Sequence, residues 1–146
     1  MNTDPPFVDV RNLHVNFTGG RKPVPAINGV DLQVRRGEVV ALIGESGSGK
    51  SVTGFSILGL IDPPGRIESG RILFKGRDLV TLPEEDMRQL RGNRIAMIFQ
   101  DPMMTLNPVL RIGTQMIEAI LAHGDASHTA ARARALDALG RVGIPS

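Results

Sequence analysis

Alternating apolar and polar side chains mark the beginning of the chain. Residues 7–17 (FVDVRNLHVNF) and 29–34 (GVDLQV) both follow this pattern, which predicts two half-buried antiparallel strands with a turn at GGRKP between them. Residues 70–76 (GRILFKG) predict a further strand. We therefore expect residues 7–37 to form an antiparallel β-subdomain.

Two other apolar runs do not alternate. Residues 38–44 (EVVALIG) and 94–100 (RIAMIFQ) are almost continuously aliphatic, and such runs are typical of strands that are buried on both faces of a sheet. A helix is predicted from Lys50 to about Ile61, where the sequence DPPG ends it. The first run and this helix make a strand, loop and helix unit.

Helical signals dominate the rest of the chain. A short helix is predicted between Pro83 and Gly92, with acidic residues at its start and arginines at its end. Two more are predicted over residues 112–123 and about 127–142, with apolar stripes formed by Ile112, Met116, Ile117, Ile120 and Leu121 and by Leu136, Leu139 and Val142. The order of elements predicts an α/β fold with a β-subdomain and a helical appendage.

A glycine-rich segment joins the first apolar run to the helix at Lys50. The pattern G-x-x-x-x-G-K-S/T is matched at every fixed position by Gly44, Glu45, Ser46, Gly47, Ser48, Gly49, Lys50 and Ser51. Because glycine has no Cβ, such a loop can curl its N–H groups around phosphate, and the helix N-terminus adds a positive end. Lys50 would then reach the β- and γ-phosphates, and the Ser51 hydroxyl would bind Mg²⁺.

Three other interpretations of this loop are weaker. A plain glycine-rich turn between strand and helix would not need the lysine and serine at these positions. A dinucleotide fingerprint would need glycine where Val52 stands, and a nucleophile elbow would need glycine where Ser48 stands. The three histidines show no spacing that would supply a base for a serine hydrolase.

Composition narrows the classes of protein further. The chain has 146 residues, 41% hydrophobic and 22% charged, which is typical of a globular domain. Its formal charge is +2 with acids and bases interspersed, which argues against nucleic acid as a partner. There is no cysteine, and hence no disulfide or thiolate site. The sequence shows no signal peptide or membrane-spanning run, so a cytoplasmic protein is expected.

The combination of two motifs resembles a known family. GESGSGKS (44–51), followed by MIFQDPMMTLNP (97–108), is similar to the ATP-binding subunits of ABC transporters, in the branch that serves dipeptide and oligopeptide importers and the related nickel importers. The resemblance implies a P-loop NTPase core, ATP and Mg²⁺ as cofactors, and an ATPase that drives peptide import. It also implies transmembrane permease subunits and a second nucleotide-binding subunit as partners, at the inner face of the cell membrane.

The resemblance also assigns individual residues. Gln100 corresponds to a glutamine that contacts Mg²⁺ near the attacking water and relays the nucleotide state, so Lys50 and Gln100 are the candidate catalytic residues and Ser51 and Gln100 the metal ligands. Phe17 corresponds to the aromatic residue that stacks on adenine, although a core role for Phe17 and an adenine contact from Val24 stay open. The nucleotide-binding set is Phe17, Gly44, Glu45, Ser46, Gly47, Ser48, Gly49, Lys50, Ser51 and Val52.

Part of the family's machinery is not found in residues 1–146. The signature sequence, the Walker B aspartate, the catalytic glutamate and the switch histidine are expected beyond residue 146, and neither Asp101 nor Glu45 replaces them. We expect a partial nucleotide-binding domain, with strands of the β-subdomain over 7–37, the P-loop core over 38–100 and the start of a helical subdomain over 101–146. In isolation it should aggregate readily and hydrolyse ATP negligibly. Two alternatives stay open: a non-hydrolysing nucleotide-binding or interaction module, and a P-loop ATPase acting on nucleic acid.

Overall fold

The computed structural model describes residues 5–20, 22–101, 105–124 and 126–144. The chain divides into two compact units, residues 1–88 and 89–146. The division lies inside helix α2 (Glu84–Leu90).

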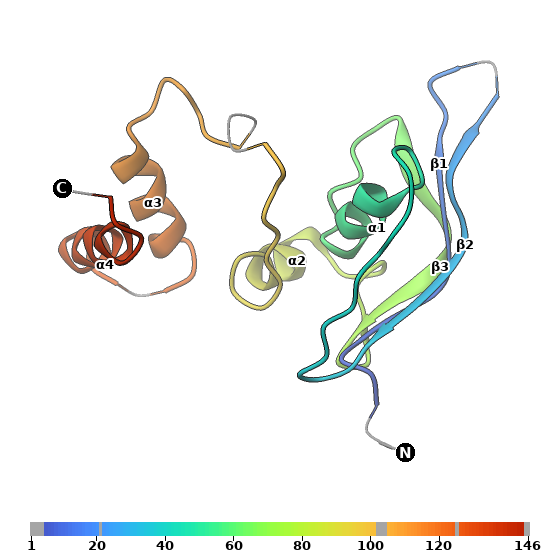
Figure 1. Cartoon of the computed structure of the whole chain (residues 1–146), viewed down its shortest axis with the longest axis horizontal. Helices are drawn as coiled ribbons and strands as arrows, with labels where there is room; N and C mark the ends of the chain where they lie inside the picture. The colour runs from blue at the N-terminus through green and yellow to red at the C-terminus, as the bar shows by residue number, and fades with distance from the viewer. Residues whose placement is uncertain (1–4, 21, 102–104, 125, 145–146) are drawn as a thin grey trace. The chain divides into compact units, whose positions relative to one another are not determined.

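The first unit is built on an antiparallel sheet. Its strands are β1 (Val8–Phe17), β2 (Val24–Val34), β3 (Gly65–Phe74) and β4 (Arg77–Asp78), in the order β2-β1-β3-β4 (Figure 1). The strands predicted at the beginning of the chain are thus confirmed. The second is longer than predicted, because its pairing with β1 continues to Val24 opposite Phe17.

A bulge in β1 sets which side chains enter the core. Val10, Leu13 and Val15 are all buried, although strict alternation would place Val10 and Leu13 on opposite faces. The pairing of β1 with β2 shifts between these two residues, and its pairing with β3 shifts between Arg11 and His14. Asn12, which lies within both shifts, adopts a φ of 44°. Opposite the bulge stands Gly70, where an added Cβ would lie 2.5 Å from the carbonyl oxygen of Asn12. The extra residue therefore brings both apolar side chains to one face.

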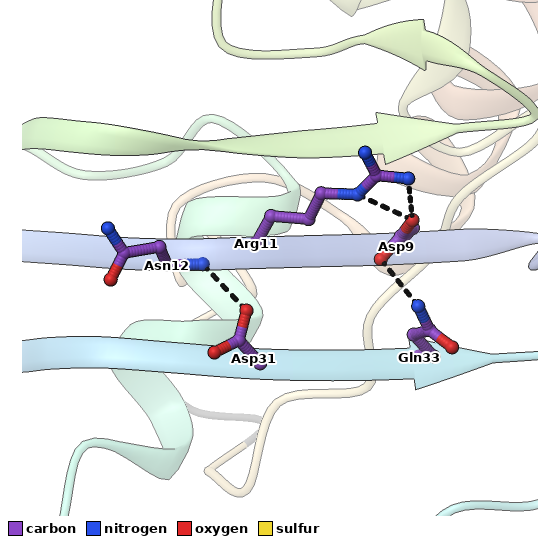
Figure 2. Close-up of polar contacts among 5 residues, drawn as sticks. All are labelled: Asp9, Arg11, Asn12, Asp31 and Gln33. Carbon is purple, nitrogen blue, oxygen red and sulfur yellow. Dashed lines mark hydrogen bonds and ion pairs between the residues drawn. The ribbon is translucent and has the colours of Figure 1, made fainter.

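Polar side chains hold this irregular part of the sheet together (Figure 2). Buried Asp9 accepts hydrogen bonds from Arg11 Nε and Nη2 at 2.8 and 2.6 Å and from Gln33 Nε2 at 3.2 Å. Asp31 Oδ1 accepts the backbone N–H of Asn12 at 2.9 Å. The hydrogen bonds from Arg11 hold the pKa of Asp9 below its ordinary value, against the opposing effect of burial.

Helix α1 (Lys50–Ile57) lies beside the sheet in the first unit (Figure 1). Leu58, which caps its C-terminus, is buried, and so are Thr53 and Ser56. The two buried hydroxyls donate to the carbonyl oxygens of Gly49 and Val52, at 3.0 and 2.7 Å, so their burial leaves no unpaired donor. The helix begins where the sequence predicts and ends four residues earlier than the predicted Ile61.

Two of the predicted strands, residues 38–44 and 94–100, do not form. Among the described residues, neither 38–44 nor 94–100 pairs in a β-ladder, and the second run takes part only in an isolated bridge between Arg91 and Ile95. Ile43 is 95% exposed and Ile98 is 98% exposed, so these runs are not buried either. A strand exists through hydrogen bonds to a neighbouring strand, and none of the described segments supplies one.

The second unit contains the helices α3 (Ile112–Leu121) and α4 (His128–Arg141), which pack against each other. The N-terminus of α4 is capped by Ser127, whose Oγ accepts the N–H of Ala130 at 3.2 Å. Of the predicted apolar stripe of α4, Leu139 is half-buried, whereas Leu136 and Val142 are exposed. Ala131 and Ala135 are buried instead, since small side chains let two helices approach closely.

Candidate phosphate-binding site

The glycine loop forms a tight turn ahead of α1. Ser48 donates its backbone N–H to the carbonyl oxygen of Glu45 at 3.2 Å, and Gly47 adopts a φ of 82°. Gly49, the N-cap of α1, has a φ of 91°, and a Cβ there would lie 2.8 Å from the carbonyl oxygen of Ala26 on β2. Only glycine fits this position, because both the backbone conformation and the neighbouring strand exclude a side chain.

Lys50 folds its side chain back over this loop. Its Nζ atom donates to the carbonyl oxygens of Gly44 at 2.8 Å and Glu45 at 2.7 Å, and to Ser48 Oγ at 3.2 Å. Three oxygen atoms thus surround one ammonium group, which has three N–H donors. The arrangement places a positive charge at the mouth of the loop, where phosphate oxygens can exchange with the backbone oxygens.

A small cavity opens between the loop and β2. It has a volume of about 140 Å³ and is lined by Ala26 and by Gly47, Ser48, Gly49, Lys50, Ser51 and Val52. No side chain caps the N-terminus of α1, and its first turn carries no acidic residue. The positive end of the helix therefore faces the cavity without competition from a carboxylate. Size, charge and donor type all fit a phosphate group.

The remaining predicted loop residues line or flank this cavity. Ser51 is exposed in the first turn of α1, and Val52 beside it is half-buried. Glu45 and Ser46 are exposed in the loop itself. Among the described residues, no group of three or more His, Asp or Glu side chains could hold a metal ion. A serine hydroxyl outside any such group suits Mg²⁺ that arrives with phosphate oxygens.

Phe17 lies at the end of β1 that is nearer to the loop. It pairs with Val24 on β2. Ala26 lies two residues further along β2, and its carbonyl oxygen is 2.8 Å from the position that a Cβ at Gly49 would occupy. Two residues of strand cover about 7 Å. The Phe17 ring is half-buried against Gly65, whereas Val24 is exposed. Both roles considered for Phe17 are compatible with this placement, so its contact with adenine stays a prediction.

Gln100 belongs to the second unit. It is exposed and follows the unpaired run at 94–100, so it is not at the end of a buried strand. Its relation to Lys50 and Ser51, which lie in the first unit, stays a prediction. The segment DPMMTLNP that follows it lies partly outside the described residues, which omit 102–104.

Ala26 is the contributor that the sequence did not reveal. It is an ordinary apolar position within a strand, and its part in the site comes from its backbone and from the fold that brings β2 to the loop. No local motif announces such a contact, because the two segments are separated by more than twenty residues.

Comparison with known families identifies the relatives of this chain. The family model for "ABC transporter" matches residues 27–146. The dipeptide transport ATP-binding protein DppD of Bacillus subtilis (strain 168) is 50% identical over 139 residues, which cover 94% of this chain and 42% of the relative. The oligopeptide transport ATP-binding protein OppD of the same organism is 47% identical over 95% of this chain and 39% of the relative. The chain therefore spans about two fifths of the length of these relatives.

Solved structures of ABC cassettes are also similar to this chain. A dimeric ATP-binding cassette in a post-hydrolysis state bound to ADP and Pi is 27% identical, with a TM-score of 0.77 over 91% of this chain and 56% of that chain. A dimeric bacterial ABC transporter cassette is 26% identical with the same TM-score. The predicted fold class, an α/β P-loop NTPase core, is confirmed. The predicted domain ranges stay a prediction.

Proposed function

Because this chain belongs to the ABC transporter family, we propose that it is the phosphate-binding part of an ATPase subunit that couples ATP hydrolysis to the import of peptides. The observation that carries the proposal is the Lys50 ammonium group held by Gly44, Glu45 and Ser48 at the N-terminus of α1. The names of the relatives, which refer to dipeptide and oligopeptide transport, support the substrate class.

The residues of the loop divide the work of binding. Lys50 exchanges its backbone partners for β- and γ-phosphate oxygens, and the N–H groups of the loop and of the first turn of α1 point at the same phosphates. Ser51 offers its hydroxyl to Mg²⁺, which supplies charge neutralisation between the phosphates when bound. Phe17 stacks on the adenine, with Val24 beside it.

Gln100 acts later in the cycle. In this proposal its amide contacts Mg²⁺ and the attacking water, and its movement reports the nucleotide state to the partner subunits. Those partners are transmembrane permease subunits and a second nucleotide-binding subunit. The protein would then lie on the cytoplasmic side of the cell membrane and attach to it through these partners. Of the described residues, no helix combines the length and apolar character needed to cross a bilayer.

Hydrolysis by this chain alone is proposed to be negligible. Neither a Walker B aspartate nor a catalytic glutamate is identified in its sequence, and phosphoryl transfer depends on positioned groups that orient water and stabilise charge. The two alternative functions differ in their readout. A non-hydrolysing module would bind nucleotide and a partner without turnover in any assembly, and a nucleic-acid ATPase would be stimulated by DNA or RNA.

Binding of Mg·ATP to this chain, measured by equilibrium dialysis, tests the proposal. Replacing Lys50 with Ala removes charge-assisted hydrogen bonds to phosphate and should weaken binding by about tenfold or more. Lys75→Asn is the matched control, because it removes one positive charge from a turn residue with a φ of 51°, a conformation that Asn tolerates. Unchanged affinity in Lys50→Ala, or an equal loss in Lys75→Asn, would contradict a phosphate site at this loop.

A further inference from the structure

Another cavity of the first unit lies at the end of β1 opposite to Phe17. It has a volume of about 430 Å³, and the described residues that line it are Pro5, Pro6, Phe7, Arg36, Lys75 and Gly76. These residues come from three segments: the chain before β1, the chain after β2, and the turn between β3 and β4. Backbone hydrogen bonds join the three, because Phe7 donates its N–H to Val34 at 2.8 Å and accepts that of Lys75 at 2.9 Å. The sheet itself therefore holds the walls of the cavity in place.

Lys75 carries its ammonium group over two aromatic rings. Its Nζ atom lies 4.9 Å from the centroid of Phe7 and 5.6 Å from that of Phe74, and both distances are within the range of cation–π attraction. The backbone of Lys75 has a φ of 51° and that of Gly76 a φ of 81°, in the two-residue turn that joins Phe74 to Arg77. Such a turn favours Asn or Gly. What the lysine contributes is therefore a positive charge at a fixed place.

Arg36 supplies a second positive charge from the turn after β2. In this turn Glu38 donates its N–H to the carbonyl oxygen of Arg35 at 3.1 Å, and Glu38 Oε2 accepts the N–H of Arg35 at 2.7 Å. No ion pair joins Arg36 or Lys75 to a carboxylate in the part of the chain that the structure describes. None of the described lining residues is acidic. Both charges thus face the cavity without a carboxylate partner from these residues.

The remaining lining side chains are apolar. Pro5, Pro6 and the half-buried ring of Phe7 form a wall beside the two cations. A guanidinium group can bind a carboxylate through two parallel hydrogen bonds, and an ammonium group adds further donors. A cavity of several hundred Å³ suits a small organic molecule better than a lone inorganic ion. Charge, wall and volume together define the ligand class.

We propose that this cavity binds a small organic carboxylate that carries a flat apolar group. Arg36 and Lys75 hold the carboxylate, and Pro6 and Phe7 contact the apolar group. The cavity and the glycine loop lie toward opposite ends of β1, so this inference does not depend on the proposed function.

Fluorescence anisotropy of N-acetyl-tryptophan tests the inference. The chain contains no Trp and no Tyr, so the indole signal belongs to the probe alone. Titration with the chain should show saturable binding. N-acetyl-tryptophanamide has the same indole without the charge and should bind at least about tenfold more weakly, the effect of one lost charge-assisted hydrogen bond. Acetate, which lacks the apolar group, should not displace the probe at an equal concentration.

Four variants locate the bound probe. Lys75→Asn suits the backbone of the turn, and Arg36→Gln keeps a polar side chain at an exposed position; each should weaken binding by about tenfold. Lys22→Asn is the matched control, because it makes the same substitution between β1 and β2, at the other end of β1. It should leave the affinity unchanged, and so should Lys50→Ala. Circular dichroism shows whether each variant is folded, and Arg36→Gln decides if Lys75→Asn is not.

Several results would overturn the inference. They are the absence of saturable binding, equal affinity for the amide, displacement by equimolar acetate, and binding that survives both Lys75→Asn and Arg36→Gln. An equal loss in Lys22→Asn would mean that net charge controls binding, and a loss in Lys50→Ala would place the probe at the glycine loop. If the probe binds as expected and Mg·ATP does not bind, the proposed function fails and this inference stands.

Discussion

Strand β1 and the segment at 38–44 belong to the same unit, and both are rich in aliphatic side chains. β1 pairs along its length with β2 and β3 and buries Val10, Leu13 and Val15. The segment at 38–44 pairs with none of the described residues and exposes most of its apolar side chains. The more hydrophobic of the two predicted strands is thus the one that does not form.

The difference shows that apolar character alone does not make a strand. Apolar and polar side chains alternate along β1, so a neighbouring strand on each edge and cover over its apolar face are sufficient to stabilise it. A continuous run such as 38–44 needs cover on both faces as well as strands on its edges, which makes it the more dependent of the two on other parts of a protein. The exposed run leads directly to the glycine loop at 44–51. The candidate site therefore lies between β2, which is paired in the sheet, and a segment that pairs with no described strand.

The largest effect is expected from matched leucine truncations in the two segments. Leu13 is 0% exposed and Leu42 is 46% exposed. Leu13→Ala should lower the free energy of unfolding by about 2–5 kcal/mol, because it leaves a cavity in the core. Leu42→Ala should lower it by less than about 1 kcal/mol. Urea denaturation followed by circular dichroism measures both values.

Equal losses of unfolding free energy in Leu13→Ala and Leu42→Ala would contradict the contrast between β1 and the segment at 38–44. They would mean that the segment at 38–44 packs as firmly as β1 does in solution. A small loss in Leu13→Ala would instead mean that the sheet core does not hold the first unit together.

Much of the fold could be predicted from local signals. Alternation located β1 and β2, and the apolar spacing located α3 and α4. The DPPG sequence and the end signals of residues 83–92 located α1 and α2 to within a few residues of their observed bounds. The bulge at Asn12 could not be predicted, because it depends on the pairing of β1 with two neighbours. The same reason explains the failures at 38–44 and 94–100, since a periodic pattern does not identify a hydrogen-bonding partner.

The candidate site was predictable where one continuous motif carries it. The contacts of Lys50 with Gly44, Glu45 and Ser48 all lie within seven consecutive residues. The contribution of Ala26 depends on how β2 passes the glycine loop. Such contacts become visible only when the backbone is folded.

A second prediction concerns the hydrogen bonds of Asp9 on β1 with Arg11 and Gln33. Asp9→Asn removes the carboxylate that Arg11 and Gln33 bind and should cost about 1–2 kcal/mol at pH 7. Arg11 is largely exposed, which places the value toward the lower end through solvent screening. Asp62→Asn, at an exposed position, is the control and should have no such effect.

The pH dependence of this effect follows from the pKa of Asp9, which is lower in the folded chain than its ordinary value. Above the unfolded pKa, about 4, the carboxylate contributes its full stabilisation. As the pH falls through the lower folded pKa, the carboxyl group is protonated in both states and the contribution is lost. The difference between the unmodified chain and Asp9→Asn should therefore shrink from pH 5 downward. A difference that grows in acid would contradict the assignment.

The smallest effect on stability is expected where the exposed run is made polar. Ile43→Lys should change the free energy of unfolding by less than about 0.5 kcal/mol, because its side chain makes no core contact to lose. It should nevertheless reduce self-association, since an extended apolar segment without strand neighbours among the described residues offers backbone groups to a second copy. Sedimentation velocity over a range of protein concentrations measures the association.

Thr114→Lys separates the position of the charge from the charge itself. It adds the same charge at an exposed position of α3, so it should leave self-association as it is in the unmodified chain. If both variants reduce association equally, net charge and not the 38–44 segment controls it. If Ile43→Lys lowers stability by more than about 1 kcal/mol, the side chain is packed in solution, and the contrast between 38–44 and β1 no longer holds.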